Sequence, residues 1–401
     1  MGLPSLFVSA NRRKRSTTVL VVAALVLSAC GASHHPPATP AVGTGVAAAV
    51  RVCDPGEGSS LARARECYQR RLLALVSAAG APATELPRVD AAVEREGGFL
   101  ADNCHILMHW VGRNYAVEHH VTLGTLQTYL PRTNDPGCSA GFAHGLISAL
   151  GSSINQLDPE SVAAACAGSP TRYQAYSCVH GLGHAYMRAY NEELPLALRM
   201  CARLPRGDVV DCAQGAFHDY WFAATGADSL VPRGQTTSPR ALCGRQPARF
   251  VRACWYRAYM SSPPSRALNA PADLAAVCAG LSPLQRQGCI TGASAIFNSG
   301  KPDRQVEGCA GLAAPDRVPC ARGAATQDLS AKPLRAMVQL VALCDRFGEQ
   351  RQGCVAWLAK ALNVDTNGRF LAAGCAAVDL KDRPACRAGA ASWRGPLETF
   401  S

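Results

Sequence analysis

The spacing of the cysteines constrains this chain more than any other feature of its sequence. From residue 166 onward the cysteines fall in pairs whose members are 10 to 12 residues apart, and the second members recur every 31 to 42 residues. A recurrence of this length marks an array of small supersecondary units. The pairs are Cys166 with Cys178, Cys201 with Cys212, Cys243 with Cys254, Cys278 with Cys289, Cys309 with Cys320, Cys344 with Cys354, and Cys375 with Cys386.

The residues around each pair predict a helix, a turn and a second helix. A short helix-forming run precedes the first cysteine, as in 160–166 and 271–278, and residues such as Pro170 and Pro283 follow it. A disulfide at such a corner is geometrically reasonable, and closing about ten residues stabilises the fold by roughly 2–3 kcal/mol. Hairpins in a chain with only 6% aromatic residues bury little alone. We therefore predict an all-α, solenoid-like stack of disulfide-stapled helical hairpins.

A glycine often stands three residues after the second cysteine of a pair, as at Gly292, Gly323 and Gly389. Glycine inside a helix costs up to about 1 kcal/mol relative to alanine. A cost that recurs in this way indicates that neighbouring helices approach each other closely at these positions.

The N-terminus carries an export signal. Basic residues at 12–15 precede a short apolar run from Thr17 to Leu27, which is too short to span a membrane, and the run ends in Leu27-Ser28-Ala29-Cys30. This box resembles the lipobox of bacterial lipoproteins. The resemblance covers about the first thirty residues and implies that residues 1–29 are removed. It also implies that Cys30 carries a diacylglycerol, with palmitate as the expected acyl group, and anchors the protein on the outer face of the cytoplasmic membrane.

The Pro-, Gly- and Ala-rich segment that follows Cys30 is typical of a flexible tether, so we assign residues 30–50 to the lipidated cysteine and its tether. The sequence has 19 cysteines, and removing Cys30 leaves an even number in an exported protein, where disulfides are permitted. The remaining cysteines are Cys53, Cys67, Cys104 and Cys138. We favour Cys53 with Cys67 and Cys104 with Cys138, although Cys53 with Cys104 and Cys67 with Cys138 is an alternative.

Histidines are confined to part of the mature chain. Eight of the ten lie between residues 105 and 218, so we divide the folded part into a histidine-rich region, 51–225, and a region of hairpin repeats, 241–401. Segments 79–91 and 226–240 are interpreted as loops. Six histidines belong to helices anchored by a cysteine: His105, His109, His144, His180, His184 and His218.

These six histidines have the spacing of metal ligands. Two pairs are four residues apart and so share one face of a helix. The other two occupy, in their own repeats, the place of His184, and equivalent places line up in a stacked array. We therefore predict a histidine-lined groove for a transition metal such as Zn, Cu or Fe. Asp102, Glu118 and Asp219 are candidate carboxylate ligands. The alternative is that the histidines are hydrogen-bonded core residues.

The sequence does not specify a reaction. The metalloprotease motif H-E-x-x-H needs a glutamate that both histidine pairs lack, and no phosphate-binding or dinucleotide-binding motif is present. Basic residues are dispersed, which argues against nucleic-acid binding. The leading hypothesis is a lipid-anchored protein that holds a metal for oxidation chemistry or for metal capture. The rival is a metal-free scaffold that binds a protein or cell-wall partner on a concave helical surface.

Overall fold

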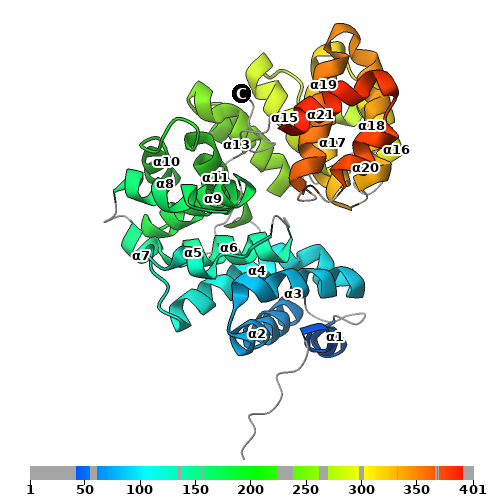
Figure 1. Ribbon diagram of the computed structural model, residues 1–401. Coiled ribbons are helices and arrows are strands. Elements are labelled where there is room, and N and C mark those ends of the chain that lie inside the picture. Colours follow the sequence, from blue (N-terminus) through cyan, green and yellow to red (C-terminus); the bar gives the residue numbers. More distant parts are fainter. Residues whose placement is uncertain are drawn as a thin grey trace, which may run out of the picture. The chain divides into compact units, whose positions relative to one another are not determined.

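The computed structural model describes residues 42–54, 61–133, 137–154, 158–170, 172–223, 238–261, 270–297, 302–331, 333–365, 368 and 370–391. Regular structure in these ranges is helical throughout, with no strand among them (Figure 1). The all-α prediction is therefore confirmed. Residues 39–401 form one compact unit, so the regions 51–225 and 241–401 belong to one continuous array.

The predicted hairpin array is confirmed. Seven helical hairpins follow one another from residue 159: α8 (Pro159–Ala167) with α9 (Arg172–Ala189), α10 (Leu194–Cys201) with α11 (Val209–Ala223), α12 (Pro239–Cys243) with α13 (Ala248–Ser261), α14 (Pro271–Val277) with α15 (Pro283–Ile296), α16 (Pro302–Ala310) with α17 (Ala314–Ala331), α18 (Pro333–Cys344) with α19 (Arg351–Asp365), and α20 (Leu371–Ala377) with α21 (Arg383–Ala391). Short 3-10 helices, Asp345–Gln350 and Leu380–Asp382, lie inside the last two connections.

Each of the seven hairpins has the disulfide that the cysteine spacing predicted. The paired Cα atoms lie 5.4–5.8 Å apart, which is normal for a disulfide. Helix starts follow local sequence signals. The side chain of Asp158 caps α8 by accepting a hydrogen bond from the backbone N–H of Ser161, and Pro159 occupies the first turn.

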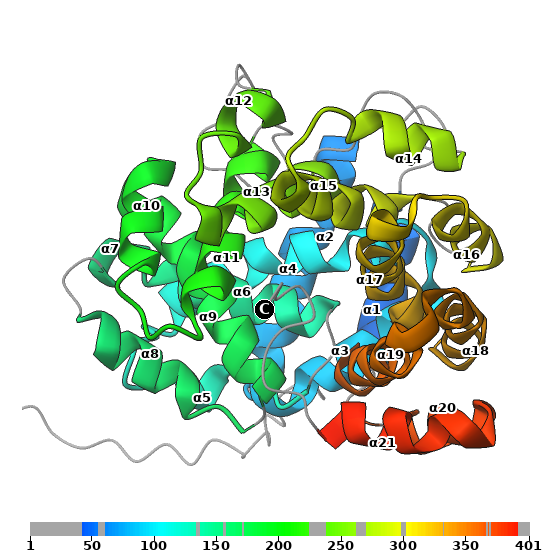
Figure 2. The ribbon, with the colours of Figure 1, turned by 90° about the horizontal axis from the view of Figure 1, so that it is seen from above.

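The second helices of the hairpins form an inner layer, and the first helices lie outside it (Figure 2). Each inner helix contacts the inner helix of the next unit, in the order α9, α11, α13, α15, α17, α19 and α21. The predicted close approach through glycine is confirmed here. A Cβ at Gly292 would overlap the carbonyl oxygen of Tyr256, and one at Gly323 would overlap that of Thr291.

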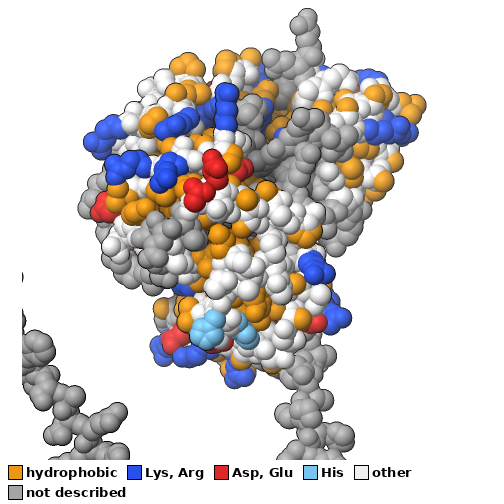
Figure 3. Space-filling view, turned by 60° about the vertical axis from the view of Figure 1, so that its left-hand side comes forward, with side chains coloured by type: hydrophobic (Ala, Val, Ile, Leu, Met, Phe, Trp, Pro, Cys, Tyr) orange, Lys and Arg blue, Asp and Glu red, His pale blue; other side chains and the backbone are white. Residues whose placement is uncertain are grey.

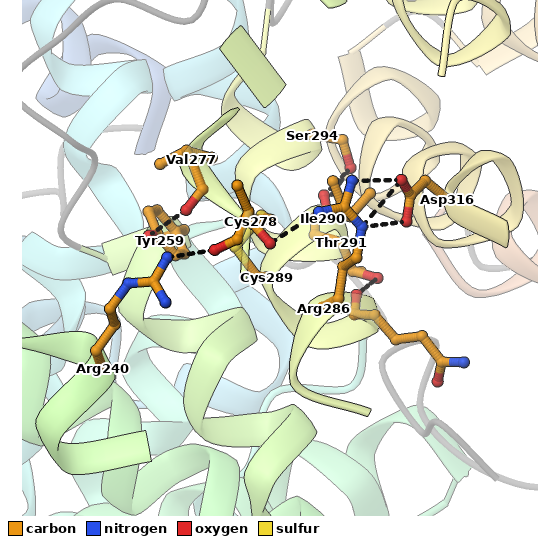
Figure 4. The surroundings of a disulfide bond; sticks show 12 residues. Arg240, Tyr259, Val277, Cys278, Arg286, Cys289, Ile290, Thr291, Ser294 and Asp316 are labelled. Atoms are coloured by element: carbon orange, nitrogen blue, oxygen red, sulfur yellow. Dashed lines mark hydrogen bonds and ion pairs between the residues drawn. A yellow bond between two sulfur atoms is a disulfide. The ribbon is translucent and has the colours of Figure 1, made fainter. Parts of the chain in front are cut away.

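Polar contacts also join neighbouring hairpins. Around the Cys278–Cys289 disulfide, Arg286 of α15 donates to the carbonyl oxygen of Cys278 at 2.8 Å and forms an ion pair with Asp316 of α17 at 2.6 Å (Figure 4). Asp316 is buried. The side chain of Arg286 therefore links the disulfide corner of one hairpin to the inner helix of the next.

Among its described residues, the N-terminal part adds seven helices to the array: α1 (Val42–Cys53), α2 (Leu61–Ala79), α3 (Pro82–Glu96), α4 (Gly98–Glu118), α5 (Leu126–Tyr129), α6 (Cys138–Ala149) and α7 (Gly151–Ile154). Disulfides join Cys53 to Cys67 and Cys104 to Cys138. The favoured pairing is confirmed, and the alternative pairing is wrong. Helices α4 and α6 are in extensive contact, and α6 contacts α9, so the N-terminal helices continue the inner layer.

Two segments that the sequence assigned to a tether or a loop are helical. Residues 42–50 belong to α1, where Val46, Ala49 and Cys53 are buried at helical spacing. Residues 82–91 belong to α3, which has a proline in its first turn and buries Leu86, Val89 and Val93. In both cases glycine and proline residues pointed to irregular structure, whereas the apolar residues at helical spacing form a buried helical face. The 226–240 loop lies outside the described residues except for 238–240.

No helix in the described ranges combines the length and apolar character needed to cross a membrane. Lys and Arg side chains lie at several separate places on the face drawn in Figure 3.

Candidate metal centre

Close helix contacts bring the histidine-bearing helices together. A Cβ at Gly141 of α6 would overlap the carbonyl oxygen of His105 in α4, and one at Gly145 would overlap that of His109. One at Gly215 of α11 would overlap the carbonyl oxygen of His180 in α9. Within each pair, α4 with α6 and α9 with α11, the helices therefore pack backbone against backbone at the level of the histidines, and short separations between imidazoles follow from this contact.

The first group of imidazoles comes from α4 and α6. His109 Nε2 lies 3.1 Å from His105 Nε2 and 3.2 Å from His144 Nδ1. The ring centroids of these three residues are 4.9–5.2 Å apart. One ring nitrogen of each histidine therefore points toward a shared space.

The second group comes from α9 and α11. His180 Nε2 lies 3.4 Å from His218 Nδ1, and the ring centroids of His180, His184 and His218 are 5.1–5.6 Å apart. His144 also lies near this group, with its ring centroid 4.8 Å from that of His180. The predicted convergence of six imidazoles from four helices is confirmed as geometry.

The distances between ring nitrogens match those between ligands of one metal ion. With metal–nitrogen bonds of about 2.1 Å, neighbouring ligand atoms are about 3.0 Å apart in an octahedral site and about 3.4 Å apart in a tetrahedral site. The observed separations of 3.1–3.4 Å fall in this range. His105 with His109 and His144, and His144 with His180 and His184, form two groups that could each hold a metal ion.

The cluster is enclosed rather than laid along an open groove. His105 is half-buried, and the other five histidines are at most 7% exposed. The predicted groove is therefore a buried site, because glycines at the helix contacts leave no space between the helices. A small pocket, with room for about one water molecule, reaches the cluster and is lined by His109, His184, Asp219, Arg113 and Glu192, among others.

Two histidines have partners that orient their rings. His184 Nδ1 lies 3.0 Å from Asp219 Oδ1, so the carboxylate accepts its proton and Nε2 remains as the basic nitrogen. His144 Nε2 lies 3.0 Å from Ser177 Oγ, while His144 Nδ1 faces His109. A hydrogen-bond acceptor on the far side of the ring, often a carboxylate as for His184, is the usual arrangement around a metal-bound histidine.

One ring nitrogen of His180, Nδ1, is buried without a hydrogen-bond partner among the described residues. A buried polar atom without a partner costs about 1–3 kcal/mol. A ligand on this nitrogen would remove that cost.

The environment keeps three imidazoles neutral. Burial, the largest cause, and neighbouring positive charge lower the pKa of His144, His180 and His218 well below the ordinary value. Arg257 of α13 is 4% exposed, donates to Gln214 Oε1 at 3.2 Å, and contributes to all three shifts. Neutral imidazole is the form that binds a metal. The charge of Arg257 also opposes a bound cation, so the ligands must offset that repulsion.

These pKa shifts predict that the metal-free protein loses stability as the pH falls. Each of the three histidines has a folded pKa below its unfolded value of about 6.5, so the unfolded chain binds more protons below that pH. Stability is therefore present above about pH 6.5 and is lost as the pH falls toward the folded pKa, by up to about 1.4 kcal/mol per histidine and pH unit. Urea unfolding of chelator-treated protein from about pH 7.5 to about pH 5.5 measures this loss.

The triple variant His144→Gln, His180→Gln, His218→Gln serves as the control, and its stability should depend much less on pH. Equal slopes for the two proteins would contradict the prediction.

The structure places the other sequence candidates in different surroundings. Glu118 is exposed and accepts a hydrogen bond from Ser77, and His119 and His120 are exposed at the end of α4. The side chain of Asp102 lies outside the described residues, while Asp219 is at the cluster.

Sequence reasoning missed Ser177 and Arg257. Ser177 stands directly before the second cysteine of its hairpin, and Arg257 stands three residues after the second cysteine of a later hairpin. Their positions in the repeat were the available signal.

No protein-family model, no curated protein and no solved structure matches this chain. The fold and the site define it as a disulfide-stapled helical array with a buried cluster of six histidines.

Proposed function

We propose that this protein is an extracytoplasmic lipoprotein that holds a transition metal in the histidine cluster. The observation that carries the proposal is the convergence of imidazole nitrogens 3.1–3.4 Å apart inside the fold. Imidazole suits Zn, Cu, Fe or Ni. The Asp219–His184 pair and the neutral state of three of the rings support metal ligation.

The location is proposed from the cysteines and the N-terminal box. All eighteen cysteines of the mature chain are in disulfides, which is typical of an oxidising compartment. Leu27-Ser28-Ala29-Cys30 resembles a lipobox, so Cys30 is the proposed lipid anchor on the outer face of the cytoplasmic membrane.

The test is elemental analysis of the exported mature protein, purified without a histidine tag. The wild type is expected to contain stoichiometric metal, and the variant with His105, His109, His180 and His184 all changed to Ala is expected to contain none. Asp219→Asn should bind metal about 10–100-fold more weakly, because the orienting carboxylate is lost. Absence of metal in the wild type, even after reconstitution with Zn, Cu and Fe, would overturn the proposal.

The element found distinguishes the two uses of such a centre. Copper or iron would permit oxidation chemistry, whereas zinc has no redox chemistry and would favour metal capture. Hydrolysis by the H-E-x-x-H mechanism lacks its glutamate in both pairs.

A second candidate function rests on the later hairpins. Three cations from neighbouring inner helices are half-buried: Arg252 of α13, Arg322 of α17 and Lys360 of α19. Burial, the larger cause, and the charge of Arg322 lower the pKa of Arg252 and of Lys360. Trp357 lies beside Arg322, whose guanidinium carbon is 5.8 Å from the ring centroid. Gathered cations with an aromatic ring suit a scaffold that binds an acidic partner. Binding of polyglutamate by the wild type and its loss in Arg322→Gln would support this function.

A further inference from the structure

We propose that the histidine cluster holds two metal ions close to one another rather than one. This inference rests on the proposed metal-binding function and goes beyond it by assigning the number of ions and the ligands of each. The first ion would lie among His105, His109 and His144. The second would be held by His180 and His184, whose set also contains His144, and His218 lies beside them with its Nδ1 3.4 Å from His180 Nε2.

The ligand atoms divide into two groups. Among the described residues, the sets of ligand atoms within 4.8 Å of one another contain three histidines each, and His144 belongs to both sets. The first set comes from α4 and α6, and the second extends into α9. A single ion has all its ligand atoms within about 4.3 Å of one another when the bonds are about 2.1 Å long. Five histidines in two overlapping sets therefore describe two adjacent positions.

The contacts between the sets indicate how close the two ions would be. The ring centroids of His109 and His184, which belong to different sets, are 5.0 Å apart. This separation is similar to those inside each set, which are 4.8–5.4 Å. Adjacent positions of this kind suit the spacing of two-metal sites, in which the ions are about 3.5–4 Å apart.

The small pocket borders both positions. His109 belongs to the first group and His184 to the second, and both line the pocket together with Asp219 and Glu192. The same lining includes Arg113 and Arg188, so its two carboxylates balance two guanidinium groups and the pocket adds no net positive charge against the two cations. The pocket has room for about one water molecule, so a small oxygen-donor ligand such as water or hydroxide is the class of molecule that would contact both ions.

Copper provides the test, because Cu(II) is visible in electron paramagnetic resonance and two nearby Cu(II) ions couple magnetically. The chelator-treated, disulfide-intact mature chain is titrated with Cu(II), and bound copper is counted by elemental analysis. We expect two ions per chain in the wild type, with a coupled signal. Two double variants remove one position each. The first combines His105→Gln with His109→Gln, and the second combines His180→Gln with His184→Gln. Each should bind one ion with an uncoupled signal.

A matched control is the double variant His119→Gln, His120→Asn. It changes two exposed histidines outside the cluster, and asparagine tolerates the positive φ of 50° at residue 120. This control should keep two coupled ions. Circular dichroism and an unchanged disulfide count confirm folding of every variant.

The outcomes separate the two proposals. One ion in the wild type would overturn the two-ion centre and leave the metal site standing. Two uncoupled ions would overturn the shared centre. No copper, and no zinc or iron in parallel titrations, would overturn the proposed function as well.

Discussion

The variant Gly215→Val is expected to lose the metal site and to be destabilised by about 3 kcal/mol, the upper part of the usual range for overpacking. A Cβ at residue 215 would overlap the carbonyl oxygen of His180, and that atom belongs to the backbone of α9. A side chain could rotate away, but a helix backbone cannot. Helices α9 and α11 must therefore separate, which moves His180 and His184 away from His218 and Asp219.

Urea unfolding and a metal titration measure the two effects. The matched control is Gly207→Val, because Gly207 is exposed and a Cβ there would have no neighbour within 4 Å. We expect a change within about 0.5 kcal/mol and full metal binding for that control. Normal metal binding by Gly215→Val would show that backbone contact between α9 and α11 does not position the histidines.

The hairpin array could be predicted because one local pattern repeats. Each disulfide closes a separation of 10 to 12 residues within one hairpin, so neither the pairing nor the helical corner depends on distant parts of the chain. The glycine after the second cysteine also repeats, which made close helix contact predictable. The helix at 42–53 has neither signal, and its buried face depends on contacts with α2 and α3.

The candidate site was predictable only in part. The repeat places His144, His184 and His218 at equivalent positions, and the spacing of His105 and His109 puts both on one face of α4. The burial of the histidine side chains depends on where the backbones of neighbouring helices touch, and the spacing of residues in the sequence does not predict those contacts. Arg257 belongs to α13, a helix outside the predicted histidine region, so its charge near the site depends on the packing of α11 against α13.

Replacing Cys201 and Cys212 by Ala is expected to cost about 3 kcal/mol and to weaken metal binding, whereas replacing Cys375 and Cys386 by Ala should leave metal binding intact. Both disulfides close a separation of 11 residues, so in the chain-entropy model they constrain the unfolded chain equally. Alanine avoids placing a hydroxyl at these buried positions. The two variants therefore differ mainly in which hairpin of the folded array loses its disulfide and opens more easily.

That location determines the effect on metal binding. The Cys201–Cys212 disulfide joins α10 to α11, the helix that carries His218 and Asp219, whereas the Cys375–Cys386 disulfide joins the last two described helices. In a repeat array each unit contacts only its neighbours, so opening of the last hairpin does not reach α11. Metal titration together with urea unfolding distinguishes the variants. Equal metal affinity in both would mean that the disulfide of α10 and α11 stabilises the chain without holding the histidines in place.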